Sequence, residues 1–140
     1  PALDFLRLLW AVDHGLQSRS KRMEAESGVT GPQRLVLRLL GKFPKSSAGK
    51  IAEMLHVHPS TLTGILKRLE AKGFLTRKED PIDKRRAVFA LSRSGIAVND
   101  SKATTVETTV KKALKRANPK DVEAAQRVLQ TIAEELEKEA

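Results

Sequence analysis

Residues 47–91 read SAGKIAEMLHVHPSTLTGILKRLEAKGFLTRKEDPIDKRRAVFAL. Two segments with helical apolar spacing come first, separated by a short turn, and a polar loop then joins two extended runs. Ser47 can cap the first helix, because a serine hydroxyl accepts a hydrogen bond from a free amide in the first turn. His56 lies in the turn, where one residue with positive φ is expected and histidine tolerates it. The stretch predicts a helix-turn-helix followed by a β-hairpin wing.

The second helix of this unit is predicted to begin at His58-Pro59, since proline fits the first helical position. It should end at Lys72-Gly73, a cation followed by glycine. Its buried stripe is predicted to be Leu62, Ile65, Leu66 and Leu69. The remaining surface is small and hydroxylic at first and cationic later, which suits a helix in a DNA major groove. We expect DNA contacts from Ser47, His58, Pro59, Ser60, Thr61, Thr63, Lys67 and Arg68.

The wing is predicted from two short extended runs, at Leu75 to Arg77 and at Ala87 to Leu91. The segment between them is rich in aspartate, proline and charge, which is typical of a loop. Three consecutive cations at its tip, beside a reading helix, favour contact with the minor groove or with phosphates. Taken alone, the same cations would equally suit a solvated turn. The expected DNA-binding residues of the wing are Arg77, Asp83, Lys84, Arg85 and Arg86.

Several motifs of this stretch and its C-terminal flank match a known family. They are Ile51-Ala52, Leu55-His56-Val57, Ser60-Thr61-Leu62-Thr63, Lys67-Arg68-Leu69-Glu70-Ala71-Lys72-Gly73, Asp80-Pro81-Ile82-Asp83-Lys84-Arg85-Arg86 and Leu91-Ser92-Arg93-Ser94-Gly95. On these residues the chain resembles the MarR family of winged-helix transcription regulators. The resemblance implies a DNA-binding homodimer in which Arg85 enters the minor groove and Asp83 braces it. Three positions depart from the family pattern: His56 replaces a usual glycine, Gly64 a common arginine and Lys50 a common acid.

Composition limits the possible classes. The chain has 140 residues, 40% of them hydrophobic, which is enough for one domain with a core. The net charge is +9, so an anionic partner is expected, either nucleic acid or an anionic membrane. Cysteine is absent, which excludes disulfides, thiolate metal sites and cysteine-based redox sensing within these residues. No apolar run approaches about 20 residues and no signal peptide is visible, so we expect a cytoplasmic protein.

Catalytic and metal-binding patterns are also missing. Neither a nucleophile motif nor a phosphate-binding loop is present, so we expect no enzyme and no cofactor. His56 and His58 are two residues apart, and no further ligand completes a metal site with them.

The flanks of the helix-turn-helix are predicted to be helical. Residues 2–27 are apolar nearly all round at first, which favours burial by a second subunit. Thr30 and Gln33 form a capping box for the next helix, whose core stripe is expected to be Leu35, Val36, Leu39 and Leu40. Ser92 should cap a long helix to about Ala117, in spite of a threonine-rich middle. Asn118-Pro119 begins the last helix.

The sequence therefore predicts a mainly α fold with a small β-hairpin wing, in one domain over residues 1–140. A winged helix-turn-helix lobe at about 30–91 stands between dimerisation helices at about 2–27 and 92–139. Dimer contacts are expected from Leu3, Leu6, Trp10, Val110, Leu114, Val122, Leu129, Ile132 and Leu136.

The function expected is a homodimeric, sequence-specific regulator of transcription on double-stranded DNA, more often a repressor in this family. Two-fold symmetry predicts a pseudo-palindromic operator with half-sites roughly 10 base pairs apart. The resemblance implies a small anionic or phenolic effector between the dimer region and the lobes. Trp10 and His14 could line its pocket, although a packed interface aromatic is the favoured reading. The alternative function is a winged-helix protein-interaction module with non-specific DNA affinity; a membrane-surface protein is weakly supported.

Overall fold

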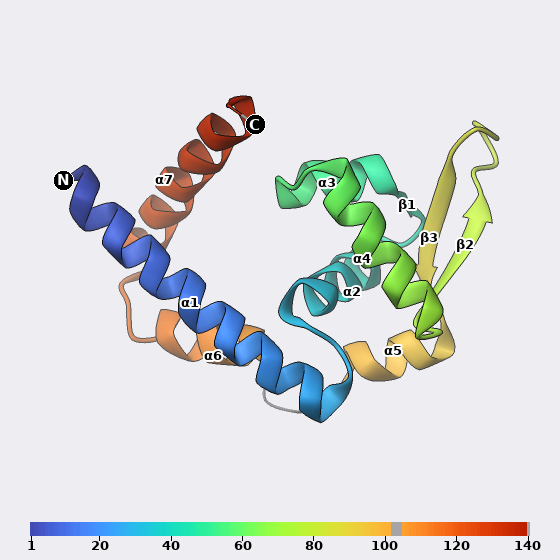
Figure 1. The fold of residues 1–140 in the computed structure, drawn as a ribbon, viewed down its shortest axis with the longest axis horizontal. Helices are drawn as coiled ribbons and strands as arrows, with labels where there is room; N and C mark the ends of the chain where they lie inside the picture. Colours follow the sequence, from blue (N-terminus) through green and yellow to red (C-terminus); the bar gives the residue numbers. More distant parts are fainter. Residues whose placement is uncertain (102–104, 140) are drawn as a thin grey trace.

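The computed structural model describes residues 1–101 and 105–139, and these form seven helices and three strands. The elements are α1 (Ala2–Ser27), α2 (Gly31–Lys42), β1 (Ser46–Ser47), α3 (Ala48–Leu55), α4 (Pro59–Ala71), β2 (Leu75–Glu79), β3 (Ala87–Leu91), α5 (Arg93–Asn99), α6 (Val106–Leu114) and α7 (Pro119–Lys138). The predicted fold class is confirmed. Figure 1 shows two parts: a reading lobe, from α2 to α5, and a frame of α1, α6 and α7.

The core of the molecule lies in the reading lobe, where α2, α3 and α4 pack against one another and against the sheet. The predicted stripe of α4 is buried as expected. The stripe predicted for α2 is partly wrong, because Leu35 is 48% exposed while Leu37 is fully buried. The buried side chains of this core are Val29, Val36, Leu37, Leu40, Ile51, Ala52, Leu62, Ile65, Leu66, Leu69, Leu75 and Phe89.

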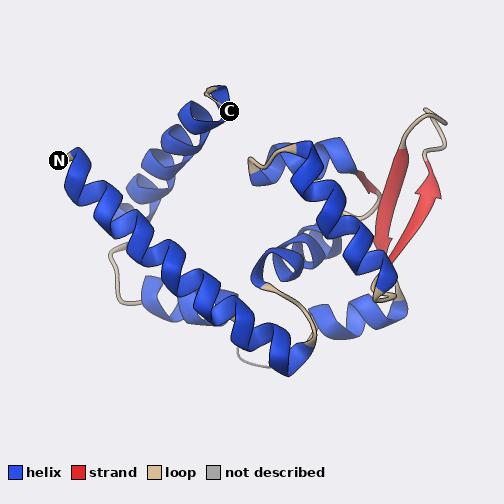
Figure 2. Ribbon diagram, viewed as in Figure 1, coloured by secondary structure: helices blue, strands red, loops and turns tan. Residues whose placement is uncertain are grey.

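A three-stranded antiparallel sheet carries the wing, with strand order β1-β3-β2 (Figure 2). The hairpin register runs from Leu75 opposite Leu91 to Glu79 opposite Ala87, so β2 extends two residues beyond the predicted run. β1 pairs Ser46 with Phe89 and was not predicted. Two residues carry no alternation of polar and apolar side chains, so the pattern used to find strands cannot detect them.

The long helix predicted from Ser92 to about Ala117 is wrong. Ser92 does cap a helix, but α5 ends at Asn99 and α6 begins at Val106. Thr105 caps α6 with a capping box: its hydroxyl accepts from the Thr108 amide at 3.2 Å, and the Thr108 hydroxyl accepts from the Thr105 amide at 2.9 Å. Threonine favours such caps over helix interiors. Ala103 and Thr104 lie outside the described residues.

The frame leaves apolar surface uncovered. In α1 only Met23 is buried, and Trp10 is 65% exposed. α1 packs on α2 and α6, whereas α5, which the sequence grouped with the dimerisation helices, packs on α2 and β3. The helices of the described part are all too short or too polar to cross a bilayer. Among the residues predicted for dimerisation, the exposed ones are Leu3, Leu6, Trp10, Val110, Leu114, Leu129 and Leu136.

Candidate nucleic-acid interface

α4 is built to present one polar face. His58 caps the helix, with its Nδ1 accepting from the Ser60 amide at 3.1 Å, and Pro59 occupies the first turn. Thr63 donates its hydroxyl proton to the Pro59 carbonyl at 2.9 Å, which leaves the hydroxyl oxygen free to accept from a ligand. Because one stripe is buried in the core, the predicted contact residues face solvent: Ser60, Thr61, Thr63, Lys67 and Arg68 are all exposed.

The turn before α4 fixes how that helix leaves α3. His56 has φ 53° and ψ 43°, the left-handed conformation predicted for it. Its amide donates to the Glu53 carbonyl at 3.4 Å, and the Val57 amide donates to the Ala52 carbonyl at 3.3 Å. These bonds close the end of α3 and direct the chain into the cap of α4.

The base of the wing loop is held by Asp80, which is only 6% exposed. Its carboxylate accepts from the Ile82 amide at 2.9 Å and from the Arg86 guanidinium at 3.1 Å. The Ile82 hydrogen bond, and then the Arg86 hydrogen bond, lower the pKa of Asp80 below its ordinary range. Arg86 is therefore turned back toward the loop and stabilises it, although its side chain remains 60% exposed.

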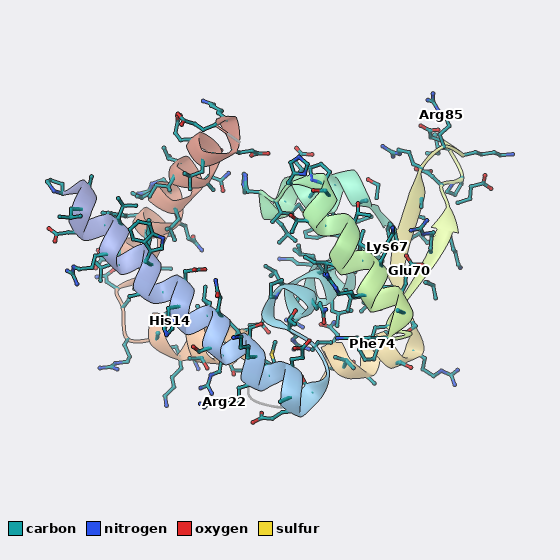
Figure 3. The ribbon with its side chains drawn as sticks, in the orientation of Figure 1. His14, Arg22, Lys67, Glu70, Phe74 and Arg85 are labelled. Atoms are coloured by element: carbon teal, nitrogen blue, oxygen red, sulfur yellow. The ribbon has the colours of Figure 1, made fainter. Side chains whose placement is uncertain are left out.

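Arg85 lies at the outer tip of the wing, with a side chain 91% exposed (Figure 3). Asp83 accepts from its Nε at 3.2 Å and from its backbone amide at 3.1 Å. The side-chain hydrogen bond from Arg85 is the main reason that the pKa of Asp83 is lowered. The predicted contact between Asp83 and Arg85 is thus present in the free protein. It orients the guanidinium while leaving most of its donors free.

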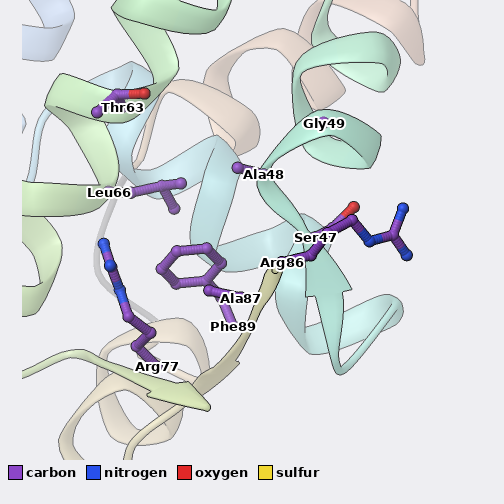
Figure 4. Close-up of a pocket in the computed structure, with 9 residues that line it drawn as sticks. All are labelled: Ser47, Ala48, Gly49, Thr63, Leu66, Arg77, Arg86, Ala87 and Phe89. Carbon is purple, nitrogen blue, oxygen red and sulfur yellow. The ribbon is translucent and has the colours of Figure 1, made fainter. Parts of the chain in front are cut away.

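A hollow of about 350 Å³ joins the start of α3, the middle of α4 and the wing (Figure 4). It brings together Ser47, Thr63 and Arg77, three of the residues predicted to bind DNA. Arg77 donates to Glu70 at 3.2 Å, and its guanidinium lies 5.4 Å from the centre of the Phe89 ring. Ser47 caps α3 by accepting from the Lys50 amide at 3.2 Å. Residues predicted from separate motifs therefore lie together around one hollow.

A second cavity, of about 600 Å³, lies between the reading lobe and the frame. Its wall is largely apolar, with side chains from α1, α2, α6 and the helix-turn-helix. Trp10 and His14, the residues suggested for an effector pocket, are not among those that line it. Both are exposed on α1. The lining of the cavity instead includes Leu16, Leu35, Leu55, Val57, Ile65, Val106 and Val110, together with Arg34, Arg38 and Glu107.

Charged residues at one side of this cavity were missed from the sequence. The Arg34 side chain is 8% exposed, and it donates to the Val98 carbonyl at 2.6 Å and lies 3.9 Å from Glu107. Its Nε is buried without a hydrogen-bond partner in the described part of the chain. Burial is the main cause that lowers the pKa of Arg34. Arg38 donates to Glu107 at 3.1 Å. The sequence did carry a signal for these residues, because the arginines stand among the apolar residues of α2.

Comparison with known proteins supplies the family. The MarR family model matches residues 29–87. The organic hydroperoxide resistance transcriptional regulator of Bacillus subtilis is 30% identical over 129 residues, covering 92% of this chain and 86% of the relative. The fold is similar to that of S. aureus MepR in a DNA complex, with TM-score 0.77, 19% identity and coverage of 94% of this chain and 97% of that one.

A ligand-bound structure is also similar in fold. It is the PcaV transcriptional regulator of Streptomyces coelicolor in complex with its natural ligand, with TM-score 0.75, 21% identity and coverage of 91% of this chain and 89% of that one. At these identities the two structures support the fold alone. The alignment with the Bacillus relative covers nearly the whole chain. That relative and the matched family are transcriptional regulators and not enzymes. The chain belongs to the MarR family of transcriptional regulators.

Proposed function

We propose that the protein is a homodimeric repressor that binds a pseudo-palindromic operator. The observation that carries this proposal is the hollow that joins the exposed face of α4 to the base of the wing, with Arg85 exposed at the wing tip. Lys67 and Arg68 would contact phosphates, while Ser60, Thr61 and Thr63 approach base edges. Arg85, held in advance by Asp83, would enter the flanking minor groove.

A second copy of the chain is the proposed cover for the frame. Apolar side chains of α1, α6 and α7 remain exposed in one chain, and large uncovered apolar surface marks an interaction site. A two-fold pair would place two α4 helices in successive major grooves, with half-sites roughly 10 base pairs apart. The single chain offers only one reading helix, so dimerisation doubles the contact with DNA.

The cavity between the lobe and the frame is the proposed effector site. Its apolar wall and the nearby Arg34 and Arg38 suit a small aromatic anion or phenol. These 140 residues contain no cysteine, so we propose reversible binding and not oxidation of a thiol, although the Bacillus relative is named for hydroperoxide resistance. The lobes can be placed in arrangements that suit DNA or do not. A ligand that binds more tightly to an unsuitable arrangement would shift the population toward it and so release the operator.

Fluorescence anisotropy tests the DNA-binding proposal. The purified protein would be titrated onto the duplex upstream of its own gene and onto a scrambled duplex, at several salt concentrations. A preference of about 10³ or more for one natural duplex at physiological salt is the expected result. If that promoter fails, selection from genome fragments supplies other duplexes. Equal, steeply salt-dependent binding to every duplex would instead support the alternative, a winged-helix protein-interaction module.

The same assay tests the effector proposal. Benzoate, an aromatic anion, should reduce operator affinity at concentrations where benzyl alcohol, its uncharged analogue, does not. Arg38→Gln should narrow that difference, because the substitution removes one of the two cations beside the cavity. An effect of benzoate that is equal in the wild type and in the variant would place its site elsewhere.

A further inference from the structure

His56 has an unusual place that the DNA contacts do not explain. It is one of two described non-glycine residues with positive φ, the other being Lys45 in the loop before β1. Glycine would adopt this conformation without steric conflict, whereas histidine only tolerates it and adds a side chain that can make contacts. The side chain is 25% exposed, and therefore most of it is covered by other parts of the molecule.

The imidazole of His56 contacts two residues of α7. Its Nε2 lies 3.0 Å from the side-chain nitrogen of Gln130, and its Nδ1 lies 3.4 Å from the carboxylate of Glu137. Gln130 also donates to Glu134 at 2.9 Å. One tautomer satisfies all three contacts: the two amide protons of Gln130 go to Glu134 and to Nε2, and Nδ1–H donates to Glu137. The network is thus consistent in every donor and acceptor.

We propose that His56 is a positioning residue, which ties the turn of the helix-turn-helix to α7 of the frame and so sets where α4 begins. The inference rests on the proposed function. Its basis is the position of the contact: His56 is two residues before the cap of α4 and more than seventy residues from Gln130 in sequence. A tie at this point acts on the reading helix at its N-terminal end, the end that carries the hydroxylic contact residues.

The opposite end of α4 is also anchored outside the helix. Lys72, at its C-terminal end, donates to the Gly28 carbonyl at 2.6 Å and to Gln33 at 2.9 Å, at the junction of α1 and α2. The two anchors hold α4 by both ends, one at each side of the lobe. Because the apolar stripe of α4 is packed in the core of the lobe, loss of the His56 anchor allows the whole lobe, with α4, to turn relative to α7. In a dimer, such turning changes the separation of the two reading helices.

Several charged residues surround the contact between His56 and α7. Lys50 and Glu53 of α3 and Glu134 of α7 line the hollow of about 410 Å³ beside His56. His58, the α4 cap, is engaged with Ser60 at 2.7 Å. In the tautomer that donates Nδ1–H to Glu137, His56 is uncharged, so its contacts with Gln130 and Glu137 are both hydrogen bonds and either residue can hold the imidazole. Variants of both α7 residues are therefore needed.

The test uses variants on both sides of the contact. His56→Asn keeps a residue that tolerates the left-handed conformation but is too short to span to α7. Gln130→Leu with Glu137→Gln removes the partners and leaves the turn itself unchanged. Glu123→Gln is the matched control, because it makes the same charge change as Glu137→Gln on the same helix without contacting His56. Each variant is measured as the full-length protein.

Two readouts are compared. Without DNA, exchange of the Val57 amide should accelerate about tenfold in the Gln130→Leu, Glu137→Gln variant and not in the control. With DNA, the wild type should prefer one half-site spacing over duplexes one base pair shorter or longer. His56→Asn and the α7 variant should each reduce that preference by threefold or more, because loosely held reading helices tolerate a wrong spacing.

The outcomes separate this inference from the proposed function. Unchanged Val57 exchange in the α7 variant would overturn the tie, whatever happens on DNA. Faster exchange with an unchanged spacing preference would overturn the positioning role. A wild-type protein without operator preference would overturn the proposed function and, with it, any effect of His56 on DNA reading; the exchange result would still decide whether the contact exists.

Discussion

At the scale of single residues, the wing depends on two aspartates that do different work. Asp80 is nearly buried and accepts hydrogen bonds from the loop backbone and from Arg86, so it shapes the loop. Among the described residues, the carboxylate of Asp83 accepts hydrogen bonds from Arg85 at the exposed tip, so it orients one guanidinium. The arrangement divides three adjacent cations: Arg86 stabilises the loop, whereas Arg85 and Lys84 face solvent. Arg85 is then the side chain best placed to enter a groove.

Arg85→Ala should weaken operator binding by about 1–3 kcal/mol, the range for a lost base-edge contact. The wing itself should survive, because Asp80 and Arg86 hold the loop without Arg85. Anisotropy on the preferred duplex measures the loss. Arg127→Ala on α7 removes the same charge far from the wing and should leave affinity nearly unchanged. Equal losses in the two variants would mean that only net charge matters, and the wing would have no specific role.

Acid should loosen the wing through Asp80. Hydrogen bonds from Ile82 and Arg86 lower its pKa, so the ionised carboxylate stabilises the loop at any pH above the ordinary range of aspartate. That stabilisation is lost as the pH falls through the lowered pKa. Amide exchange of residues 80–86 should therefore rise on acidification before exchange in α4 does. In Asp80→Asn, amide exchange of the loop should be fast already at neutral pH. If exchange in that variant still rises on acidification as it does in the wild type, Asp80 is excluded as the cause.

At the scale of elements, α5 is attached to the wing by close backbone contact. Ser92 donates its amide to the Phe74 carbonyl at 3.0 Å and its hydroxyl to the Gly73 carbonyl at 2.6 Å. Gly95 follows in the first turn, and a Cβ added there would be 2.1 Å from the Phe74 carbonyl oxygen. No side chain can be accommodated at that position unless backbone moves. The Ser92 to Gly95 motif thus seats α5 on the start of the hairpin.

Gly95→Ala should lower the free energy of unfolding by about 1–3 kcal/mol, the range for overpacked sites. Gly49→Ala is its matched control: Gly49 also lies in a helix, but a Cβ there meets nothing within 4 Å. That substitution should be neutral or should stabilise by up to about 1 kcal/mol, because alanine favours helix. Urea unfolding at one fixed protein concentration gives both values. Destabilisation by Gly49→Ala as large as by Gly95→Ala would contradict the steric argument.

The sequence predicted the elements whose signals are local and missed those that depend on tertiary contact. The caps at Thr30, Ser47 and Asn118 form hydrogen bonds within three residues, so short motifs were sufficient to find them. The left-handed turn at His56 was likewise predicted from the chain around it. In contrast, β1 exists only because β3 lies beside it. The break before α6 was missed because Thr105 was read as an interior residue when it is a cap.

The candidate site divides in the same way. The reading face of α4 and the contact of Asp83 with Arg85 followed from spacing and from the family resemblance. Arg34 was missed because its burial depends on Val98 and Glu107, more than sixty residues away in sequence. Apolar periodicity identifies a face of a helix but not the element that packs on it. The spacing therefore predicted Leu35 and not Leu37 for the core of α2. Leu35 instead lines the cavity toward the frame.

At the scale of the whole molecule, the frame leaves large apolar side chains exposed in the single chain. Leu129 on α7 is 48% exposed and Trp10 on α1 is 65% exposed, while none of the described core residues of the reading lobe comes from either helix; Val29 lies in the loop between α1 and α2. The lobe can therefore stay folded when the frame is altered. This separation allows dimerisation to be tested without unfolding the DNA-reading surface.

Leu129→Glu should convert the proposed dimer into a folded monomer, because a carboxylate cannot be buried between two apolar helix faces without a partner. Sedimentation velocity measures the change of mass, and circular dichroism should show helix content close to that of the wild type. Operator affinity should fall by 10² or more, since two half-sites no longer bind as one linked unit. Gln126→Glu makes the same charge change on an exposed position of α7 and should remain dimeric. If Leu129→Glu also remains a dimer, the second copy covers a different face. If the variant becomes monomeric but keeps its operator affinity, each lobe reads DNA independently. The operator then need not be a palindrome.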